Sequence, residues 1–255
     1  MPIEIRQFPC LSDNYGFLIR DKASGMVAAI DTPEVSAINK TLEDAGWRLD
    51  YIFNTHWHPD HAGGNLALKE QWNCEIVGPA GEAERIPGID RKVADGDVVM
   101  LGEAKSTVLD TPGHTSGHIV YHFADDGAAF VGDTIFAMGC GRLFEGTPAQ
   151  MVSSLSKITD MPPETMLYCA HEYTAANAAF AATVDPENVA LAARIEEVKK
   201  LRGENTPTVP TKLSRELATN PFLRAGQPSV QRAVGMPGGD EVEVFAEIRI
   251  RKDNF

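Results

Sequence analysis

Three histidines and an aspartate lie within six consecutive residues of this chain, in the run His56-Trp57-His58-Pro59-Asp60-His61. Imidazole nitrogens and carboxylate oxygens are ligands for zinc, iron or manganese, and a set without thiolate is typical of catalytic rather than closed structural sites. Because the chain has seven histidines in 255 residues, we prefer a metal site over a surface loop that happens to be rich in histidine. The run predicts a metal-dependent enzyme.

Three more candidate ligands each follow a β-rich run. They are His114 in Thr111-Pro112-Gly113-His114, Asp133 in Gly132-Asp133-Thr134, and His171 in Cys169-Ala170-His171. Binding residues gather on the loops that follow strands, so we expect these three side chains to converge on one pocket. Taken singly, each has an alternative reading as a turn histidine, an aspartate that begins a turn, or a histidine at a domain joint.

The elements that must position these residues alternate between strands and helices. Strands are predicted at 3–8, 17–20, 27–31, 51–54, 75–78, 98–101, 107–110, 119–123 and 128–131, and helices at 34–45, 65–72 and 148–158. This alternation indicates layered α/β structure, and the excess of strands favours a sandwich flanked by helices.

After about His171 the β-branched runs stop, and Ala, Glu, Lys and Arg recur at helical spacing. Asp185-Pro186 predicts the start of a helix, and Leu191, Ile195, Val198 and Leu201 form its apolar stripe. Further helices are expected at 212–218 and from about 240 to 251. The pattern predicts a small helical domain at 175–255, after a larger domain at 1–174.

The acidic composition argues against two classes of partner. A net charge of -13 disfavours a nucleic acid or an anionic membrane surface, since both attract clustered cations. The first ten residues lack the pattern of a secretory leader, and no run of about 18 apolar residues occurs. We therefore expect a cytoplasmic protein. A monomeric state is also expected.

The four cysteines and two further histidines are expected to be structural. Cys10, Cys74, Cys140 and Cys169 are scattered without C-x-x-C spacing, which favours buried free thiols, although Cys140 between two glycines is a possible nucleophile. His118 is predicted to support the site or the fold. His122 lies in a predicted strand and is expected to be a packed or surface residue.

The succession T-H-x-H-x-D-H, T-P-G-H, G-D-T and a late histidine resembles the metallo-β-lactamase superfamily over residues 1 to about 174. The resemblance implies an α/β fold, the four-layer αβ/βα sandwich. It also implies two divalent metal ions, with zinc favoured and iron or manganese as alternatives. It assigns His56, His58 and His114 to one ion, Asp60, His61 and His171 to the other, and Asp133 as the bridge.

A second resemblance spans nearly the whole chain. The stretches Gly139–Thr147, His171–Thr174, Ala218–Arg224 and Arg249–Phe255 resemble those of the hydroxyacylglutathione hydrolases, also called glyoxalase II. This resemblance implies that Arg142, Phe144, Tyr173, Arg249 and Lys252 bind the substrate. Two positions depart from many family members, because Arg142 stands where lysine is common and Phe144 where tyrosine is common. Phe144 has no hydroxyl to offer glutathione.

The function implied is hydrolysis of a glutathione thioester such as S-D-lactoylglutathione, the second step of methylglyoxal detoxification. Asp60 and Asp133 are the expected catalytic residues, and a metal-bound hydroxide is the expected nucleophile. A thiol leaving group has an ordinary pKa of about 8.5, so no strong general acid is required. The alternatives are a persulfide dioxygenase, a lactonase or phosphodiesterase, and a non-catalytic metal-binding module.

Overall fold

The computed structural model describes residues 3–255, which divide into two compact units. The first unit contains the residues up to Asp110 together with Thr115–Gly132. The second contains Thr111–His114 and Asp133–Phe255. The first two residues of the predicted domain 1–174 lie outside the described residues, and its boundary at 174 stays a prediction.

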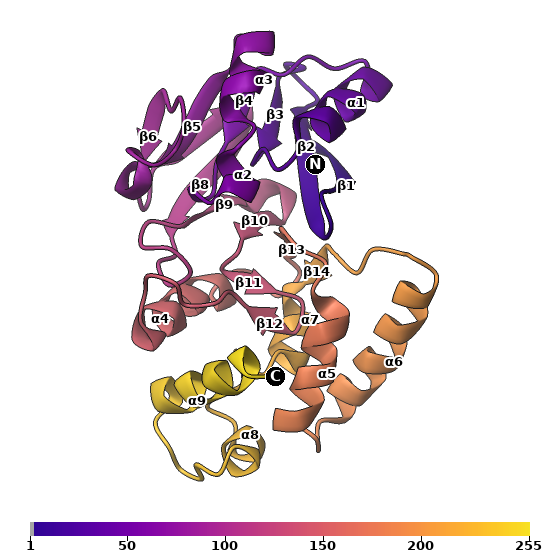
Figure 1. Ribbon diagram of the computed structural model, residues 1–255, viewed down its shortest axis with the longest axis vertical. Coiled ribbons are helices and arrows are strands. Elements are labelled where there is room, and N and C mark those ends of the chain that lie inside the picture. The colour runs from indigo at the N-terminus through magenta and orange to yellow at the C-terminus, as the bar shows by residue number, and fades with distance from the viewer. Residues whose placement is uncertain (1–2) are drawn as a thin grey trace. The chain divides into compact units, whose positions relative to one another are not determined.

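The first unit begins with a six-stranded sheet whose strands follow one another in chain order (Figure 1). Its strands are β1 (Ile3–Cys10), β2 (Asn14–Asp21), β3 (Val27–Ile30), β4 (Tyr51–Phe53), β5 (Glu75–Pro79) and β6 (Arg91–Val93). The first three are antiparallel, and β3 to β6 are parallel. The carboxyl ends of β3, β4 and β5 therefore lie at one edge, where polar residues that follow them can meet.

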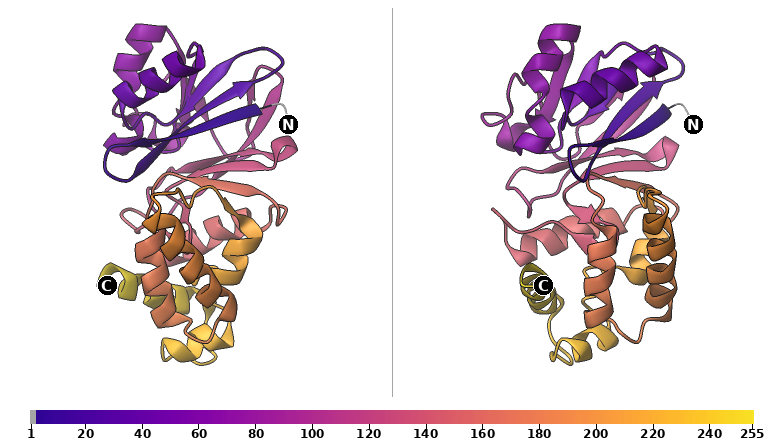
Figure 2. Two further views of the ribbon diagram at one scale, coloured as in Figure 1. Left: turned by 90° about the vertical axis from the view of Figure 1, so that its right-hand side faces the viewer. Right: turned by 45° about the vertical axis from the view of Figure 1, so that its right-hand side comes forward.

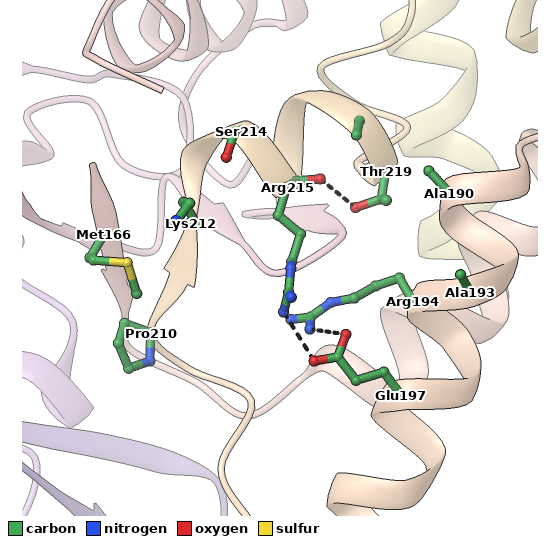
Figure 3. Close-up of a pocket in the computed structure, with 11 residues that line it drawn as sticks. Met166, Ala190, Ala193, Arg194, Glu197, Pro210, Lys212, Ser214, Arg215 and Thr219 are labelled. Carbon is green, nitrogen blue, oxygen red and sulfur yellow. Dashed lines mark hydrogen bonds and ion pairs between the residues drawn. The ribbon is translucent and has the colours of Figure 1, made fainter. Parts of the chain in front are cut away.

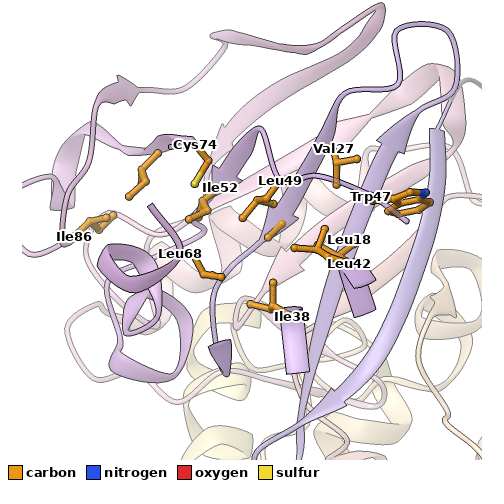
Figure 4. Packing of buried hydrophobic residues seen from close by; sticks show 12 residues of the cluster. Leu18, Val27, Ile38, Leu42, Trp47, Leu49, Ile52, Leu68, Cys74 and Ile86 are labelled. Carbon is orange, nitrogen blue, oxygen red and sulfur yellow. The ribbon is translucent and has the colours of Figure 1, made fainter. Parts of the chain in front are cut away.

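Helices α1 (Val35–Ala45) and α3 (Asn65–Trp72) connect the parallel strands, and their buried apolar side chains pack with those of the sheet (Figure 4). Ile38 and Leu42 lie four residues apart on α1, and they pack with Leu68 of α3 against apolar side chains of β2 to β5. Burial of one such leucine or isoleucine contributes about 1.5–3 kcal/mol. Helix α1 ends at Gly46, whose φ of 65° suits glycine.

A second sheet of the first unit packs against the other face. Strands β7 (Val98–Leu101), β8 (Ala104–Asp110), β9 (Ile119–Phe123) and β10 (Ala128–Gly132) are antiparallel and follow the chain order. Phe17 meets Phe130 at a ring distance of 5.6 Å, and Phe53 stacks on Tyr121 at 5.3 Å. These contacts join the two sheets into a sandwich, as the strand pattern predicted.

The second unit is mainly helical and includes one short hairpin. Its elements are β11 (Ile135–Phe136), β12 (Gly139–Cys140), α4 (Pro148–Thr159), β13 (Met166–Cys169), α5 (Thr174–Val184), α6 (Val189–Gly203), β14 (Thr211–Lys212), α7 (Leu213–Thr219), α8 (Pro228–Ala233) and α9 (Glu241–Asp253). Helices α5 and α6 lie side by side (Figure 2). Ala178 and Ala181 of α5 pack there with Leu191 and Val198 of α6.

The predicted start of α6 at Asp185 is wrong. Asn188 is the N-cap, because its side chain accepts a hydrogen bond from the Leu191 N–H at 3.1 Å. The Asp185 carboxylate instead accepts hydrogen bonds from Arg224 Nε at 2.8 Å and from Asn188 Nδ2 at 2.8 Å. No helix within residues 3–255 is long and apolar enough to cross a membrane.

Candidate metal centre

The first set of predicted ligands lies on the loop that follows β4. His56 is buried and His58 is half-buried, and His56 Nε2 lies 3.0 Å from His58 Nδ1. Pro59 then begins the short helix α2 (Pro59–Ala62), whose single turn carries Asp60 and His61. His61 Nε2 lies 3.6 Å from Asp60 Oδ2. The loop and the turn thus gather all four side chains of the run.

Asp31 fixes the orientation of His61, and its role was not predicted from the sequence. Its Oδ2 accepts hydrogen bonds from His61 Nδ1 at 2.8 Å and from Thr55 Oγ1 at 2.7 Å, while Oδ1 accepts from the Thr55 N–H at 2.8 Å. Because a carboxylate accepts, the His61 proton lies on Nδ1 and Nε2 is the nitrogen suited to a metal. Potential ligand atoms of Asp31, His56 and His61 lie within 4.8 Å of one another.

Two further residues that sequence reasoning missed hold the same loop. Buried Glu82, just after β5, accepts hydrogen bonds from the Trp57 N–H at 2.9 Å and from the Gly117 N–H at 2.8 Å. Asn14 Nδ2 donates to Asp60 Oδ2 at 3.1 Å. Asp31 follows β3 and Glu82 follows β5, the parallel strands on either side of β4, and that placement is the signal that could have found them.

The two remaining histidines lie as predicted. His118 is buried and stacks on His56, with ring centroids 4.7 Å apart. It supports the ligand loop from β9's amino end. His122 is half-buried on β9, and burial lowers its pKa.

The second set of predicted ligands lies in the second unit, where Asp133 stands between two histidines. Its Oδ2 lies 3.3 Å from His114 Nε2, and its Oδ1 lies 3.4 Å from His171 Nε2. All three side chains are buried. His114 Nδ1 donates to the Arg142 carbonyl at 2.9 Å, which leaves Nε2 as the metal-binding nitrogen. A carboxylate with each oxygen facing one histidine suits a bridge between two cations.

Three aromatic rings border these histidines. Tyr173 lies parallel to His171, with centroids 4.7 Å apart and planes 5° apart, and Phe136 meets His171 edge-on at 5.8 Å. Phe144 lies 5.2 Å from His114 and is 62% exposed. Tyr173 and Phe144 thus offer apolar surface beside the ligands, and their role in substrate binding stays a prediction.

The predicted cations of α9 differ in their surroundings. Arg249 is 5% exposed, and it donates to the Cys140 carbonyl at 2.9 Å and pairs with Asp253 at 2.9 Å. Lys252 is half-buried, and its Nζ lies 5.3 Å from the Phe180 ring centroid. Burial, and then the charges of Arg249 and Arg142, lower the Lys252 pKa. Exposed Arg142 lies 3.8 Å from Asp253. Arg142 and Lys252 are therefore better placed than Arg249 for direct contact with an anion.

All four cysteines are free and buried, as predicted. Burial raises the pKa of the Cys140 thiol to about 11, although the nearby Arg249 charge acts to lower it. A thiol with that pKa is protonated at neutral pH and is a poor nucleophile. The possible nucleophilic role of Cys140 is therefore disfavoured.

A separate pocket of about 660 Å³ lies within the second unit (Figure 3). Arg194 and Arg215 line it, and both guanidinium groups bind the Glu197 carboxylate, at 3.0 and 3.2 Å. Its lining contains none of the predicted ligands or substrate residues. The pocket therefore contributes nothing to the candidate centre.

The ligand sets of both units fit divalent metal ions. Each combines buried imidazole with carboxylate, and neither includes a thiolate. Hydrogen bonds to Asp31 and to the Arg142 carbonyl put the protons of His61 and His114 on Nδ1. Such donor sets suit zinc, iron or manganese.

The chain is similar to characterised protein families along its length. Residues 30–171 match the model of the metallo-beta-lactamase superfamily, and residues 172–255 match that of the hydroxyacylglutathione hydrolase C-terminus. The chain is 57% identical to the hydroxyacylglutathione hydrolase of Hyphomonas neptunium, over 99% of this chain and 98% of the relative. It is 56% identical to that of Erythrobacter litoralis, over 99% of this chain and 100% of the relative.

Among solved structures, the crystal structure of ETHE1 from Myxococcus xanthus matches with a TM-score of 0.69 at 25% identity. The match covers 97% of this chain and 90% of that one. The predicted fold class, a metallo-β-lactamase sandwich with a helical C-terminal region, is confirmed.

Proposed function

The chain belongs to the hydroxyacylglutathione hydrolases of the metallo-β-lactamase superfamily, and we propose that it hydrolyses S-(2-hydroxyacyl)glutathione to glutathione and a 2-hydroxy acid. S-D-lactoylglutathione is the proposed substrate, which places the reaction second in methylglyoxal detoxification. The observation that carries this proposal is full-length identity above 50% to relatives of that name. The persulfide dioxygenase alternative is not favoured.

We propose two domains, with residues 1–174 as the catalytic domain and residues 175–255 as the domain that binds glutathione. The change from one family model to the other between residues 171 and 172 supports this division. Four buried free thiols and a glutathione substrate support a reducing compartment, so we propose a cytoplasmic location. A monomeric state is a separate proposal.

The histidine and aspartate clusters support a centre for two metal ions. We propose zinc in both positions, with His56, His58 and His114 as ligands of one ion and Asp60, His61 and His171 as ligands of the other. Asp133 would be the ligand that the two ions share. When bound, two such ions would supply Lewis acidity and a nucleophilic water at neutral pH.

The chain's own residues contribute orientation and substrate binding. Asp31 and the Arg142 carbonyl hold two histidines through Nδ1, so that each ring keeps one tautomer and one direction. With two divalent ions bound, the carboxylates of Asp133 and Asp60 would cancel part of the metal charge, and the positive charge that is left would attract an anionic substrate. The thiolate of glutathione can depart without a general acid, because its ordinary pKa is near 8.5.

Arg142, Lys252 and Tyr173 are the proposed contacts for glutathione. Cations suit the two carboxylates of the tripeptide, and the exposed ring of Tyr173 suits its backbone. Phe144 is proposed to pack on the substrate without a hydrogen bond. Arg249 is proposed to act through the hydrogen bond that it donates to the Cys140 carbonyl.

A comparison of two thioesters tests the substrate class. S-D-lactoylglutathione carries the tripeptide, and the D-lactoyl thioester of N-acetylcysteamine carries the same acyl group without it. We expect kcat/KM to be at least about 100-fold higher for the first, since two charge-assisted contacts supply roughly 3 kcal/mol together. Equal kcat/KM values would show a thioesterase that does not recognise glutathione.

A further inference from the structure

The β11–β12 hairpin touches all three ligands of the second unit. Asp133 lies two residues before Ile135, where β11 begins. Phe136 of β11 packs edge-on against His171, with centroids 5.8 Å apart. Beyond β12, the Arg142 carbonyl accepts the hydrogen bond of His114 Nδ1. The position of this hairpin therefore sets the direction of Asp133, His114 and His171 together.

The hairpin is too short to be stable without contacts from the rest of the second unit. It consists of two strands of two residues each, and Met138 between them has a φ of 54°, which is uncommon for a residue with a side chain. Two residue pairs, Ile135 with Cys140 and Phe136 with Gly139, make up its register. A ribbon this short is marginal without outside support.

Three buried side chains of the C-terminal helices supply that support. Glu216 of α7 accepts a hydrogen bond from the Met138 N–H at 2.7 Å. Asn220 Nδ2, just after α7, donates to the carbonyls of Phe136 at 3.1 Å and Gly139 at 2.9 Å. Asn177 Nδ2 of α5 donates to the Ala137 carbonyl at 3.1 Å. Every residue from Phe136 to Gly139 is thus bound through its backbone.

Glu216 is the centre of this clamp of Glu216, Asn220 and Asn177. Its side chain is fully buried, and it also accepts hydrogen bonds from Thr211 Oγ1 at 2.7 Å and from Asn220 at 3.2 Å. One carboxylate therefore binds the hairpin turn, the short strand β14 and the second clamp residue. Its removal takes the acceptor from two buried donors, the Met138 N–H and the Thr211 hydroxyl, and removes one of three acceptors around Asn220 Nδ2.

The space around the turn is equally restricted. A Cβ atom added at Gly139 would lie 2.4 Å from Asn177 Nδ2. One added at Gly141 would lie 2.1 Å from the Asp133 carbonyl oxygen and 3.1 Å from His114 Nδ1. The clamp and the ligands thus touch opposite ends of the same hairpin at close range, so movement at the turn reaches the ligands.

We propose that Glu216, with Asn177 and Asn220, is a positioning residue for the metal centre and holds Asp133, His114 and His171 in place through the β11–β12 hairpin. The C-terminal helices would then position the metal ligands in addition to their proposed role in binding glutathione. The inference rests on the proposed function for its catalytic consequence. Its metal-binding consequence requires no substrate.

The alternative is that Glu216 serves the stability of the second unit alone, and Asp185 is the matched control for that. Asp185 is also a buried carboxylate, and it accepts hydrogen bonds from Arg224, Asn188 and Ser229. None of these partners belongs to the hairpin. Glu216→Ala and Asp185→Ala remove carboxylates of the same kind, but the first alone unclamps the turn.

The test measures metal retained per chain after dialysis against a weak chelator, thermal unfolding, and kcat and KM with S-D-lactoylglutathione. We expect Glu216→Ala to lower metal affinity or kcat about 10–100-fold, as loss of outer partners of metal ligands does. KM should change little. Asp185→Ala should lose stability and keep its metal. Glu216→Gln, which keeps one acceptor oxygen for Met138, should restore most of the metal.

Equal metal retention and equal kcat in the Glu216→Ala and Asp185→Ala variants would overturn the proposal. If Glu216→Ala does not accumulate, Asn177→Ala removes one clamp bond and leaves Glu216 in place, and it should weaken metal retention in the same direction; normal retention there would also overturn it. A wild-type protein that holds two ions and cleaves no thioester would overturn the proposed function instead, while the metal measurements still decide the role of Glu216.

Discussion

His61 Nδ1 and Asp31 Oδ2 are joined by a buried hydrogen bond of 2.8 Å, and Asp31 has a φ of 58°. The unusual backbone angle suits aspartate or asparagine far better than alanine. Two requirements therefore limit the residue type at this position: it must tolerate a positive φ, and its side chain must accept the hydrogen bond from His61.

Asp31→Asn tests the two requirements separately. Asparagine tolerates the backbone angle, but it has only one side-chain oxygen to accept hydrogen bonds where aspartate uses two. We expect metal affinity or kcat to fall about 10–100-fold with a small change in stability. Asp31→Ala should lose metal affinity and also stability. Metal counting after dialysis, together with thermal unfolding, checks this. Normal metal content and turnover in Asp31→Asn would show that His61 needs no carboxylate partner.

Glu82→Ala leaves the partly buried N–H groups of Trp57 and Gly117 without their Glu82 acceptor. We expect a loss of about 1–3 kcal/mol in the free energy of unfolding for each unsatisfied donor that water cannot reach. The ligand loop should also bind metal less tightly. Urea unfolding and metal titration measure the two effects, with exposed Glu84→Ala as the control. A Glu82→Ala variant as stable as Glu84→Ala would contradict the assignment.

Lys252 should give the enzyme a pH-dependent KM. Burial, followed by the charges of Arg249 and Arg142, lowers its pKa from the ordinary 10.5. The ammonium is charged below its folded pKa and loses its charge as the pH rises through that value, so KM should rise at alkaline pH before 10.5 is reached. Lys252→Arg should move this rise to higher pH, since a guanidinium stays charged. If KM depends on pH in the same way in the wild type and in Lys252→Arg, Lys252 does not bind glutathione.

Asp133 and Cys140 should respond oppositely to substitution. Asp133→Ala removes the carboxylate between His114 and His171, and we expect it to abolish turnover and bound metal together.

Cys140→Ala removes a buried thiol whose pKa is raised to about 11, and we expect kcat to be nearly unchanged. Steady-state kinetics and metal counts check both. Inactive but fully metallated Cys140→Ala would restore the nucleophile hypothesis.

Much of the fold could be predicted because strong local patterns determine it. The predicted strand at 119–123 and the predicted helix at 65–72 have the observed bounds. The strands β11, β12 and β14 were missed, since two residues carry no periodicity and their pairing depends on distant side chains. The start of α6 was misplaced because Asp185 and Asn188 are both good caps, and the partner Arg224 decides between them.

In the candidate site, too, local patterns predicted some residues, and contacts between residues distant in sequence determine the others. The run from His56 to His61 carries its chemistry in consecutive residues, so its type and spacing sufficed. Asp31 and Glu82 act through atoms 30 and 25 residues away in sequence, His61 Nδ1 and the Trp57 N–H. Neither contact follows from a local pattern. The burial of Arg249 was likewise invisible, because the helix pattern of α9 does not reveal that the Cys140 carbonyl accepts from it.

The most direct test of the account is turnover of S-D-lactoylglutathione by protein whose metal content has been counted. Oxygen uptake with glutathione persulfide is measured on the same sample. We expect hydrolysis in proportion to the fraction of chains that hold two ions, and no oxygen uptake. A fully metallated sample that cleaves no acylglutathione would contradict the assignment.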